Sequence, residues 1–152
     1  MSHDRLTRRP RRLPTVWVND DHACFFVTIC VAERKPVLAN ANIHAHLVEF
    51  LESSRQRYGW CPGRYVIMPD HIHLFLRKGD ERTTLGNWIK ALKAMVSRRE
   101  FRWQAGFFDH VLRSRDSVEE KWEYVVQNPV RAGLVERPED WRFGGEVRAE
   151  GE

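Results

Sequence analysis

Cysteine is scarce in this sequence: Cys24, Cys30 and Cys61 are its three cysteines among 152 residues, and none shares a C-x-x-C spacing. This odd, unpatterned set excludes a disulfide scaffold and a zinc finger, and it favours a reducing compartment. The sequence also lacks an apolar run near the roughly 20 residues that a membrane helix needs. Its first residues do not resemble a signal peptide. We therefore expect a cytoplasmic protein with no membrane partner.

Internal repeats, low-complexity linkers and a second domain are missing as well. The length suits one domain with its own hydrophobic core. With 42% hydrophobic and 30% charged residues, the composition excludes a disordered or fibrous chain. We expect a single domain over 1–152, made of a basic arm (1–14), a core (15–135) and an acidic tail (136–152).

The net charge of +4 is small, but the charges are unevenly distributed. Residues 1–14 contain five arginines and one aspartate, and residues 86–115 contain seven basic and two acidic residues. Residues 136–152 carry a net negative charge. These runs indicate either a solvated surface or contacts to a phosphate backbone. The DNA contacts predicted on the second explanation are Arg5, Arg8, Arg9, Arg11 and Arg12 in the arm, and Lys90, Lys93, Arg98, Arg99 and Arg102 in the central segment.

Hydrophobic periodicity predicts an α+β domain, in which helices pack on an antiparallel sheet. The helix over 42–58 should stop at Gly59, and the helix that contains Tyr124 should begin at Ser117, an N-cap with Glu120 three residues on. A turn at Pro69–Asp70 separates two strands. The expected elements are strand 23–31, helix 42–58, strands 64–68 and 71–77, helix 85–101, strand 106–112, and a helix from 117 to about 127 or 128.

Two H-x-H pairs occur, and the expected elements separate them. His71 and His73 fall in a strand, where side chains two residues apart share a face and can converge on one divalent ion. His44 and His46 fall in a helix, where about 200° of rotation points them apart. Imidazole suits zinc, manganese and, less well, magnesium. The alternative is two surface histidines on a half-exposed strand, and a metal site still needs a third ligand.

Tyr124 and Asn128 are four residues apart in a predicted helix and therefore share one face. A partly buried tyrosine followed by an Asn-Pro helix stop is one explanation of this pair. The other makes Tyr124 a nucleophile, with Asn128 as an oxygen ligand for a metal. A phenol with a pKa of about 10 is a weak nucleophile unless a metal polarises its target.

Three segments together resemble a known family. YVIMPDHIHLFLR, which begins at Tyr65, resembles the histidine–hydrophobic–histidine motif of the HUH single-tyrosine transposases. WQAGFFDHVLR, from Trp103, and YVVQNPVRAGLV, from Tyr124, resemble segments of the branch associated with repetitive extragenic palindromic (REP) elements. The likeness spans about 15–135 with the three motifs in order. It implies a ferredoxin-like sheet, a Mg²⁺ or Mn²⁺ ion, and site-specific cleavage and rejoining of single-stranded or hairpin DNA.

Carried over to this sequence, the resemblance makes His71, His73 and Asn128 the metal ligands and Tyr124 the nucleophile that forms a 5′-phosphotyrosine. Asp109 and His110 match a recurrent Asp-His pair, which either shapes the sheet or supports the metal ligands. Both a monomer and a homodimer agree with the family. Two alternatives stay open: a non-catalytic regulator that binds palindromic DNA, and a metal-dependent phosphohydrolase that needs no tyrosine.

Overall fold

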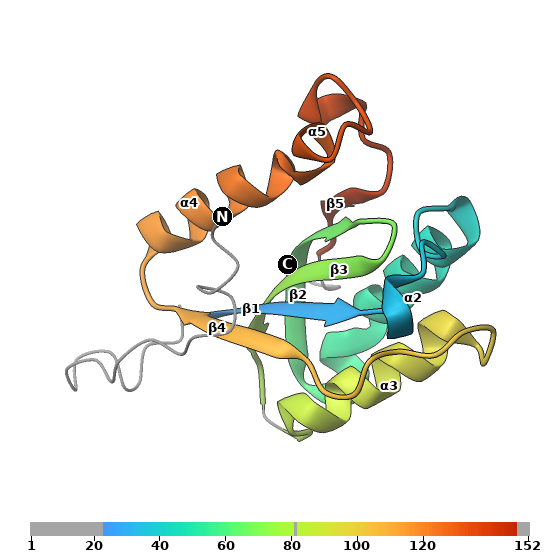
Figure 1. The fold of residues 1–152 in the computed structure, drawn as a ribbon. Coiled ribbons are helices and arrows are strands. Elements are labelled where there is room, and N and C mark those ends of the chain that lie inside the picture. Colours follow the sequence, from blue (N-terminus) through green and yellow to red (C-terminus); the bar gives the residue numbers. More distant parts are fainter. Residues whose placement is uncertain (1–22, 81, 149–152) are drawn as a thin grey trace.

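The structure is a computed structural model that describes residues 23–80 and 82–148. The expected arm contacts Arg5, Arg8, Arg9, Arg11 and Arg12 lie outside the described residues. A five-stranded antiparallel sheet forms the centre, in the order β4-β1-β3-β2-β5 (Figure 1). Its strands are β1 (Cys24–Cys30), β2 (Trp60–Ile67), β3 (His71–Lys78), β4 (Phe108–Leu112) and β5 (Gly144–Glu146).

Helices cover both faces of this sheet. On one face lie α2 (Ala41–Tyr58) and α3 (Leu85–Ser97), and on the other lies α4 (Arg115–Val126), which continues into the short α5 (Asn128–Arg131) (Figure 1). Two short 3-10 helices, η2 (Ala32–Arg34) and η3 (Pro138–Asp140), complete the elements. No described helix is long and apolar enough to cross a membrane.

The alternation of side chains along β1 explains why the sheet is covered twice. Val27 and Ile29 belong to the larger core under α2 and α3, whereas Cys24 and Phe26 belong to a smaller core under α4. Side chains of a strand point alternately to its two faces, so a strand that is apolar at nearly every position must be buried on both sides. This confirms the predicted α+β fold.

The ends of α2 follow from local chemistry. The side chain of Asn40 accepts a hydrogen bond from the backbone N–H of Ile43 at the start of the helix. Gly59 ends it in the left-handed region, with φ +80°. A Cβ at Gly59 would lie 2.0 Å from Oδ1 of Asp80, so both the backbone angle and the space require glycine. The predicted stop at Gly59 is confirmed.

Two predicted helix ends were wrong. The helix of Tyr124 begins three residues earlier than expected, because Ser114 and not Ser117 is the N-cap: its Oγ accepts from the N–H of Ser117 at 3.0 Å. The basic helix α3 ends at Ser97 and not at residue 101, because Arg98 and Arg99 take left-handed backbone angles. A capping box and an apolar stripe locate a helix to within a turn, and local hydrogen bonding decides its end.

Two strands also differ from the expectation. Strand β2 begins at Trp60, four residues early, and its register with β3 shifts between Pro62 and Tyr65. Proline lacks an N–H for the ladder, so a strand that contains it needs such an irregularity. Strand β5 falls in the expected acidic tail and pairs antiparallel with β2. The tail segment therefore contributes to the sheet.

Candidate active site

His71 and His73 begin β3 on the face that α4 covers. Their ring centroids are 4.7 Å apart, and their strand partners are Cys30 and Thr28 of β1. A pocket of about 580 Å³ lies at this end of the sheet. Its polar and charged lining side chains are Thr28, Arg34, His71, His73, Tyr124, Asn128 and Arg131. The strand face and the α4–α5 segment therefore bring the four predicted catalytic and metal-binding residues together.

The two imidazoles are held by their Nδ1 atoms. Nδ1 of His73 lies 2.9 Å from Oγ1 of Thr28, and Nδ1 of His71 lies 2.7 Å from Oδ1 of Asp70. Because a carboxylate only accepts, His71 donates from Nδ1 to Asp70. Support at Nδ1 is typical of histidines that bind a metal through Nε2.

The protonation of this cluster follows from burial and charge. Burial, with the positive charges of neighbouring groups, lowers the pKa of His73 well below its usual value, so the ring is neutral at pH 7. Burial alone would raise the pKa of Asp70, but its bonds to His71 and Arg34 hold it below the ordinary value. Nε of Arg34 donates to Oδ2 of Asp70 at 2.8 Å. The site thus combines the neutral imidazole of His73 with the ionised carboxylate of Asp70, which is hydrogen-bonded to His71.

Arg131 joins the tyrosine to the asparagine. Its guanidinium carbon lies 3.9 Å from the centre of the Tyr124 ring, and Nη2 donates to the Tyr124 carbonyl at 2.6 Å. The same Nη2 donates to Oδ1 of Asn128. With Arg34, the described residues that line the pocket include two arginines and no carboxylate, a charge balance that suits a phosphate group.

The pocket offers side chains of types that bind a divalent metal ion. It also places two of them, the imidazoles of His71 and His73, side by side. No group of three His, Cys, Asp or Glu side chains among the described residues is placed to bind a metal, so the ligands would be two imidazoles and an amide oxygen. His73, which is neutral, and His71, whose ring is oriented by Asp70, are suited to be the two imidazole ligands. Asn128 lines the same pocket, and its Oδ1 accepts a hydrogen bond from Arg131.

The predicted basic segment lies elsewhere. Lys90 and Lys93 are on α3, and Arg98 and Arg99 follow it directly, in the layer on the other side of the sheet from the histidines (Figure 1). Nζ of Lys93 donates to the carbonyls of Gln104 and Gly106, at 2.9 and 2.7 Å. Arg102 lies in the connection from α3 to β4. The structure does not bring these five residues to the pocket.

Asp109 and His110, predicted as a supporting pair, point to opposite faces of β4. Asp109 pairs with Val27 and shares the α2–α3 face, whereas His110 pairs with Phe26 and shares the α4 face. Nδ1 of His110 is buried with no hydrogen-bond partner among the described residues. Burial is the main cause that lowers the pKa of His110. Neither residue lines the pocket.

Four residues of the site escaped the sequence argument: Thr28, Arg34, Asp70 and Arg131. Asp70 directly precedes His71, and Arg131 lies three residues after Asn128, so spacing could have revealed both. The contact of Thr28 with His73 depends on the register of β1 against β3, which a local pattern does not contain. Arg34 reaches Asp70 across 36 residues of sequence.

An antiparallel sheet that holds two imidazoles beneath a helix-borne tyrosine, with arginines beside it, is the arrangement expected of a single-tyrosine transposase. Residues 21–114 match the family described as "Transposase IS200 like", and the chain belongs to this family. The matched segment includes both histidines and ends before α4. The resemblance found in the sequence motifs is thereby confirmed.

Two similar proteins carry the name of REP-associated tyrosine transposases. The chain is 28% identical over 83 residues to the REP-associated tyrosine transposase of Escherichia coli K12, covering 52% of this chain and 50% of that protein. A Haemophilus influenzae protein that is provisionally given the same name is 26% identical over 149 residues, covering 83% of this chain and 82% of that one.

A solved structure has the same fold. A REP-associated tyrosine transposase bound to a REP hairpin superposes with a TM-score of 0.66, covering 89% of this chain and 80% of its own, at 19% identity. The shared fold includes the antiparallel sheet and the helices on it.

Proposed function

We propose that this chain cleaves and rejoins single-stranded or hairpin DNA through a covalent bond to Tyr124. The observation that carries the proposal is that Tyr124, His71, His73 and Asn128 line one pocket. Two further observations support it: the family is one of transposases, and the relatives are named for REP elements. The proposed substrate is a hairpin with single-stranded flanks.

In the proposed reaction, Oη of Tyr124 attacks the phosphorus of a phosphodiester, and its phenolic proton passes to water. The bond from phosphorus to the 3′-oxygen breaks, and that oxygen takes up a proton to become a 3′-hydroxyl. The products are a 5′-phosphotyrosine and a free 3′ end. Because the phosphotyrosine ester keeps the bond energy, a second 3′-hydroxyl can attack it and rejoin a strand without ATP.

His71, His73 and Asn128 would hold a Mg²⁺ or Mn²⁺ ion in this pocket. When bound, such an ion polarises the phosphoryl group and offsets the charge that develops on the leaving oxygen. Thr28 and Asp70 serve this role indirectly, because they fix the rotation of the two rings through Nδ1. The low pKa of His73 keeps the ring unprotonated, as a metal ligand must be.

Arg131 and Arg34 would bind the non-bridging oxygens of the same phosphate. A guanidinium offers two parallel N–H donors that match phosphate geometry. Arg131 already lies against Tyr124 and Asn128, so exchanging Asn128 for a phosphate oxygen would move it little. The exchange would free the amide oxygen when DNA enters.

The test is a search for a protein–DNA adduct that survives denaturation. Labelled hairpin oligodeoxynucleotides with randomised single-stranded flanks are incubated with the protein and Mg²⁺, or with EDTA, and separated on a denaturing gel. We expect an adduct that needs the metal and is lost in Tyr124→Phe. Tyr58→Phe, which changes a tyrosine on α2, is the matched control and should keep the adduct.

Each other outcome has a distinct meaning. Cleavage that persists in Tyr124→Phe would contradict the covalent route and favour a phosphohydrolase. Hairpin binding without any adduct in the unchanged protein would favour the DNA-binding regulator.

A further inference from the structure

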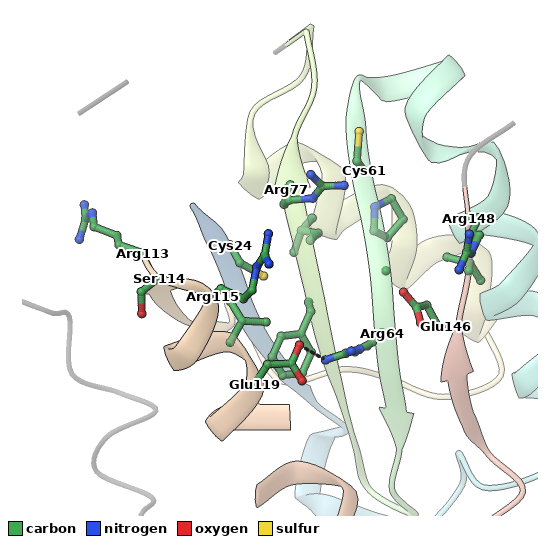
Figure 2. Close-up of a pocket in the computed structure, with 16 residues that line it drawn as sticks. Cys24, Cys61, Arg64, Arg77, Arg113, Ser114, Arg115, Glu119, Glu146 and Arg148 are labelled. Atoms are coloured by element: carbon green, nitrogen blue, oxygen red, sulfur yellow. Dashed lines mark hydrogen bonds and ion pairs between the residues drawn. The ribbon is translucent and has the colours of Figure 1, made fainter. Parts of the chain in front are cut away.

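A second pocket of about 580 Å³ lies on the same face of the sheet as the candidate active site, at the opposite ends of the strands. Its walls come from the end of β3, the start of β2, the segment after β5 and the first turn of α4 (Figure 2). Its charged lining residues, among those that the structure describes, are five arginines and two glutamates: Arg64, Arg77, Arg113, Arg115 and Arg148, with Glu119 and Glu146. We call this the arginine pocket.

Among the described residues, most of the arginines of the arginine pocket have no ion-pair partner. Nη1 of Arg64 lies 3.1 Å from Oε2 of Glu119, and its guanidinium rests on the Trp122 ring. Arg77, Arg115 and Arg148 make no ion pair with any described residue. Figure 2 shows Arg77 and Arg115 extending over the same hollow, whereas Arg113 points outward.

The positive field reaches the floor of the pocket. Burial raises the pKa of the Cys24 thiol to about 11, and the charges of Arg77 and Arg64 oppose that rise. Arg115 is the first residue of α4, a position where the helix dipole favours anions and not cations. Its charge is therefore badly placed for the helix and well placed for a bound anion.

Helix α4 links this pocket to the candidate active site. Arg115 and Tyr124 are both on α4, nine residues apart, so about 14 Å of helix separates them at a rise of about 1.5 Å per residue. Along the axis of a duplex, the phosphates of one strand are spaced by about 3.4 Å, and in an extended single strand they lie further apart. At most about four nucleotides would therefore bridge the two sites.

We propose that the arginine pocket binds the phosphodiester backbone of the strand that enters the active site, within about four nucleotides of the cleaved bond. The inference rests on the proposed single-stranded DNA substrate. It differs from the sequence expectation, which placed the core DNA contacts on α3 and its following segment. Arg77 and Arg115 contact the phosphates, and Arg148 adds positive charge to the wall that follows β5.

The first experiment compares two pairs of substitutions that remove the same charge. Arg77→Gln with Arg115→Gln removes two of the arginines that line the arginine pocket, and Arg57→Gln with Lys90→Gln removes two positive charges from α2 and α3 on the other face. Binding of a fluorescent dT20 oligonucleotide is measured by anisotropy over a KCl series. Losing two phosphate contacts should lower the log–log salt slope by about 1.4 and the affinity about 20-fold at 0.1 M salt.

The control pair should leave both quantities unchanged, and both proteins should keep the thermal midpoint of the unchanged chain. Equal losses in the two pairs would show a general charge effect and overturn the proposal. A loss confined to the Arg57→Gln, Lys90→Gln protein would overturn the proposal too, and would favour the surface that the sequence indicated.

The second experiment uses Cys61, a half-buried thiol that lines the arginine pocket. Cys24 and Cys30 are buried, and burial raises the pKa of both thiols. A dT20 strand with a tethered disulfide should therefore crosslink to Cys61. The crosslink should disappear in Cys61→Ser and weaken in the Arg77→Gln, Arg115→Gln protein.

Absence of a Cys61 crosslink in the unchanged protein would overturn the proposal. Neither experiment needs catalysis, so the two hypotheses fail separately. If dT20 binds in the arginine pocket but no adduct forms on hairpin DNA, only the proposed function fails. If the adduct forms while both pocket tests are negative, only the further inference fails.

Discussion

Arg131 stacks on Tyr124, with its guanidinium carbon 3.9 Å from the ring centre, and the same side chain donates to Asn128. One cation therefore contacts both the proposed nucleophile and the proposed amide ligand. Because Asn128 and Arg131 belong to α5, which directly follows α4, a small movement of this turn would affect both residues together.

Replacing Arg131 should slow the proposed reaction without unfolding the chain. Arg131→Ala should lower the rate of adduct formation by about 100-fold, the usual cost of removing one donor to a developing charge. The residue is exposed, so lost stacking should cost about 0.5–1 kcal/mol of stability at most. The measurements are single-turnover adduct formation and urea unfolding.

Arg131→Lys is the conservative comparison, because it keeps the charge and loses the planar pair of donors. Its rate should lie between those of the unchanged protein and Arg131→Ala. A rate equal to that of the unchanged protein in both variants would remove Arg131 from the reaction.

The structure places the tyrosine and the histidines of one chain in one pocket, so each chain should react alone. When Tyr124→Phe protein is mixed with His73→Ala protein, no adduct should form. In a dimer that exchanged the tyrosine helix, one partner would supply Tyr124 and the other an intact His73, and about a quarter of the sites in a random mixture would recover. The check is a denaturing gel of the mixture after prolonged incubation.

The sequence predicted which residues of the candidate site come together better than it predicted their surroundings. A spacing of two in a strand places His71 and His73 on one face, and a spacing of four in a helix aligns Tyr124 with Asn128. Both rules are local, and neither depends on which elements pack together. The structure has all four residues lining one pocket.

The sequence did not predict on which face of the sheet the basic residues lie. Seven basic residues in 86–115 indicated a DNA surface, but nothing in that segment determines which face of the sheet α3 covers. The arginine pocket escaped for the same reason, because Arg77, Arg115 and Arg148 come from separate parts of the chain. Only the strand order and the path of α4 place them around one hollow.

Stability should fall as the pH drops below about 6.5. His44, His73 and His110 all have a lowered pKa, chiefly because of burial. Between the folded and unfolded pKa values, the unfolded chain binds more protons, so acid favours unfolding. Each fully buried histidine could contribute up to about 1.4 kcal/mol per pH unit, and the more accessible His44 and His110 should contribute less.

Urea unfolding in EDTA at pH 7.5, 6.5, 5.8 and 5.0 measures this dependence, because the series runs from about 1 unit above the ordinary histidine pKa to about 1.5 units below it. His44→Gln is the informative variant, because Nε2 of His44 lies 2.7 Å from the Tyr65 hydroxyl and glutamine can accept that bond without titrating. The variant should be less sensitive to acid than the unchanged protein. A stability that rises on acidification would contradict the assigned direction.

A buried chain of hydrogen bonds stabilises the core between the sheet and the α2–α3 layer. Nε1 of the fully buried Trp88 donates to Oγ of Ser54 at 2.6 Å, and that hydroxyl donates to the Trp60 carbonyl at 3.0 Å. Ser54 thus bridges α3 to the start of β2. Ser54→Ala leaves the indole N–H buried and unpaired, which should cost about 1–3 kcal/mol.

Trp88→Phe removes the donor and keeps an aromatic ring against Phe50, whose centroid is 5.4 Å away. The double variant with Ser54→Ala should lose less stability than the sum of the two single losses, by about 0.5–3 kcal/mol, because the unpaired indole N–H is absent from it. Urea unfolding of the four proteins at pH 7.5 measures the coupling. Additive losses would mean that the bond from Trp88 to Ser54 contributes nothing to stability.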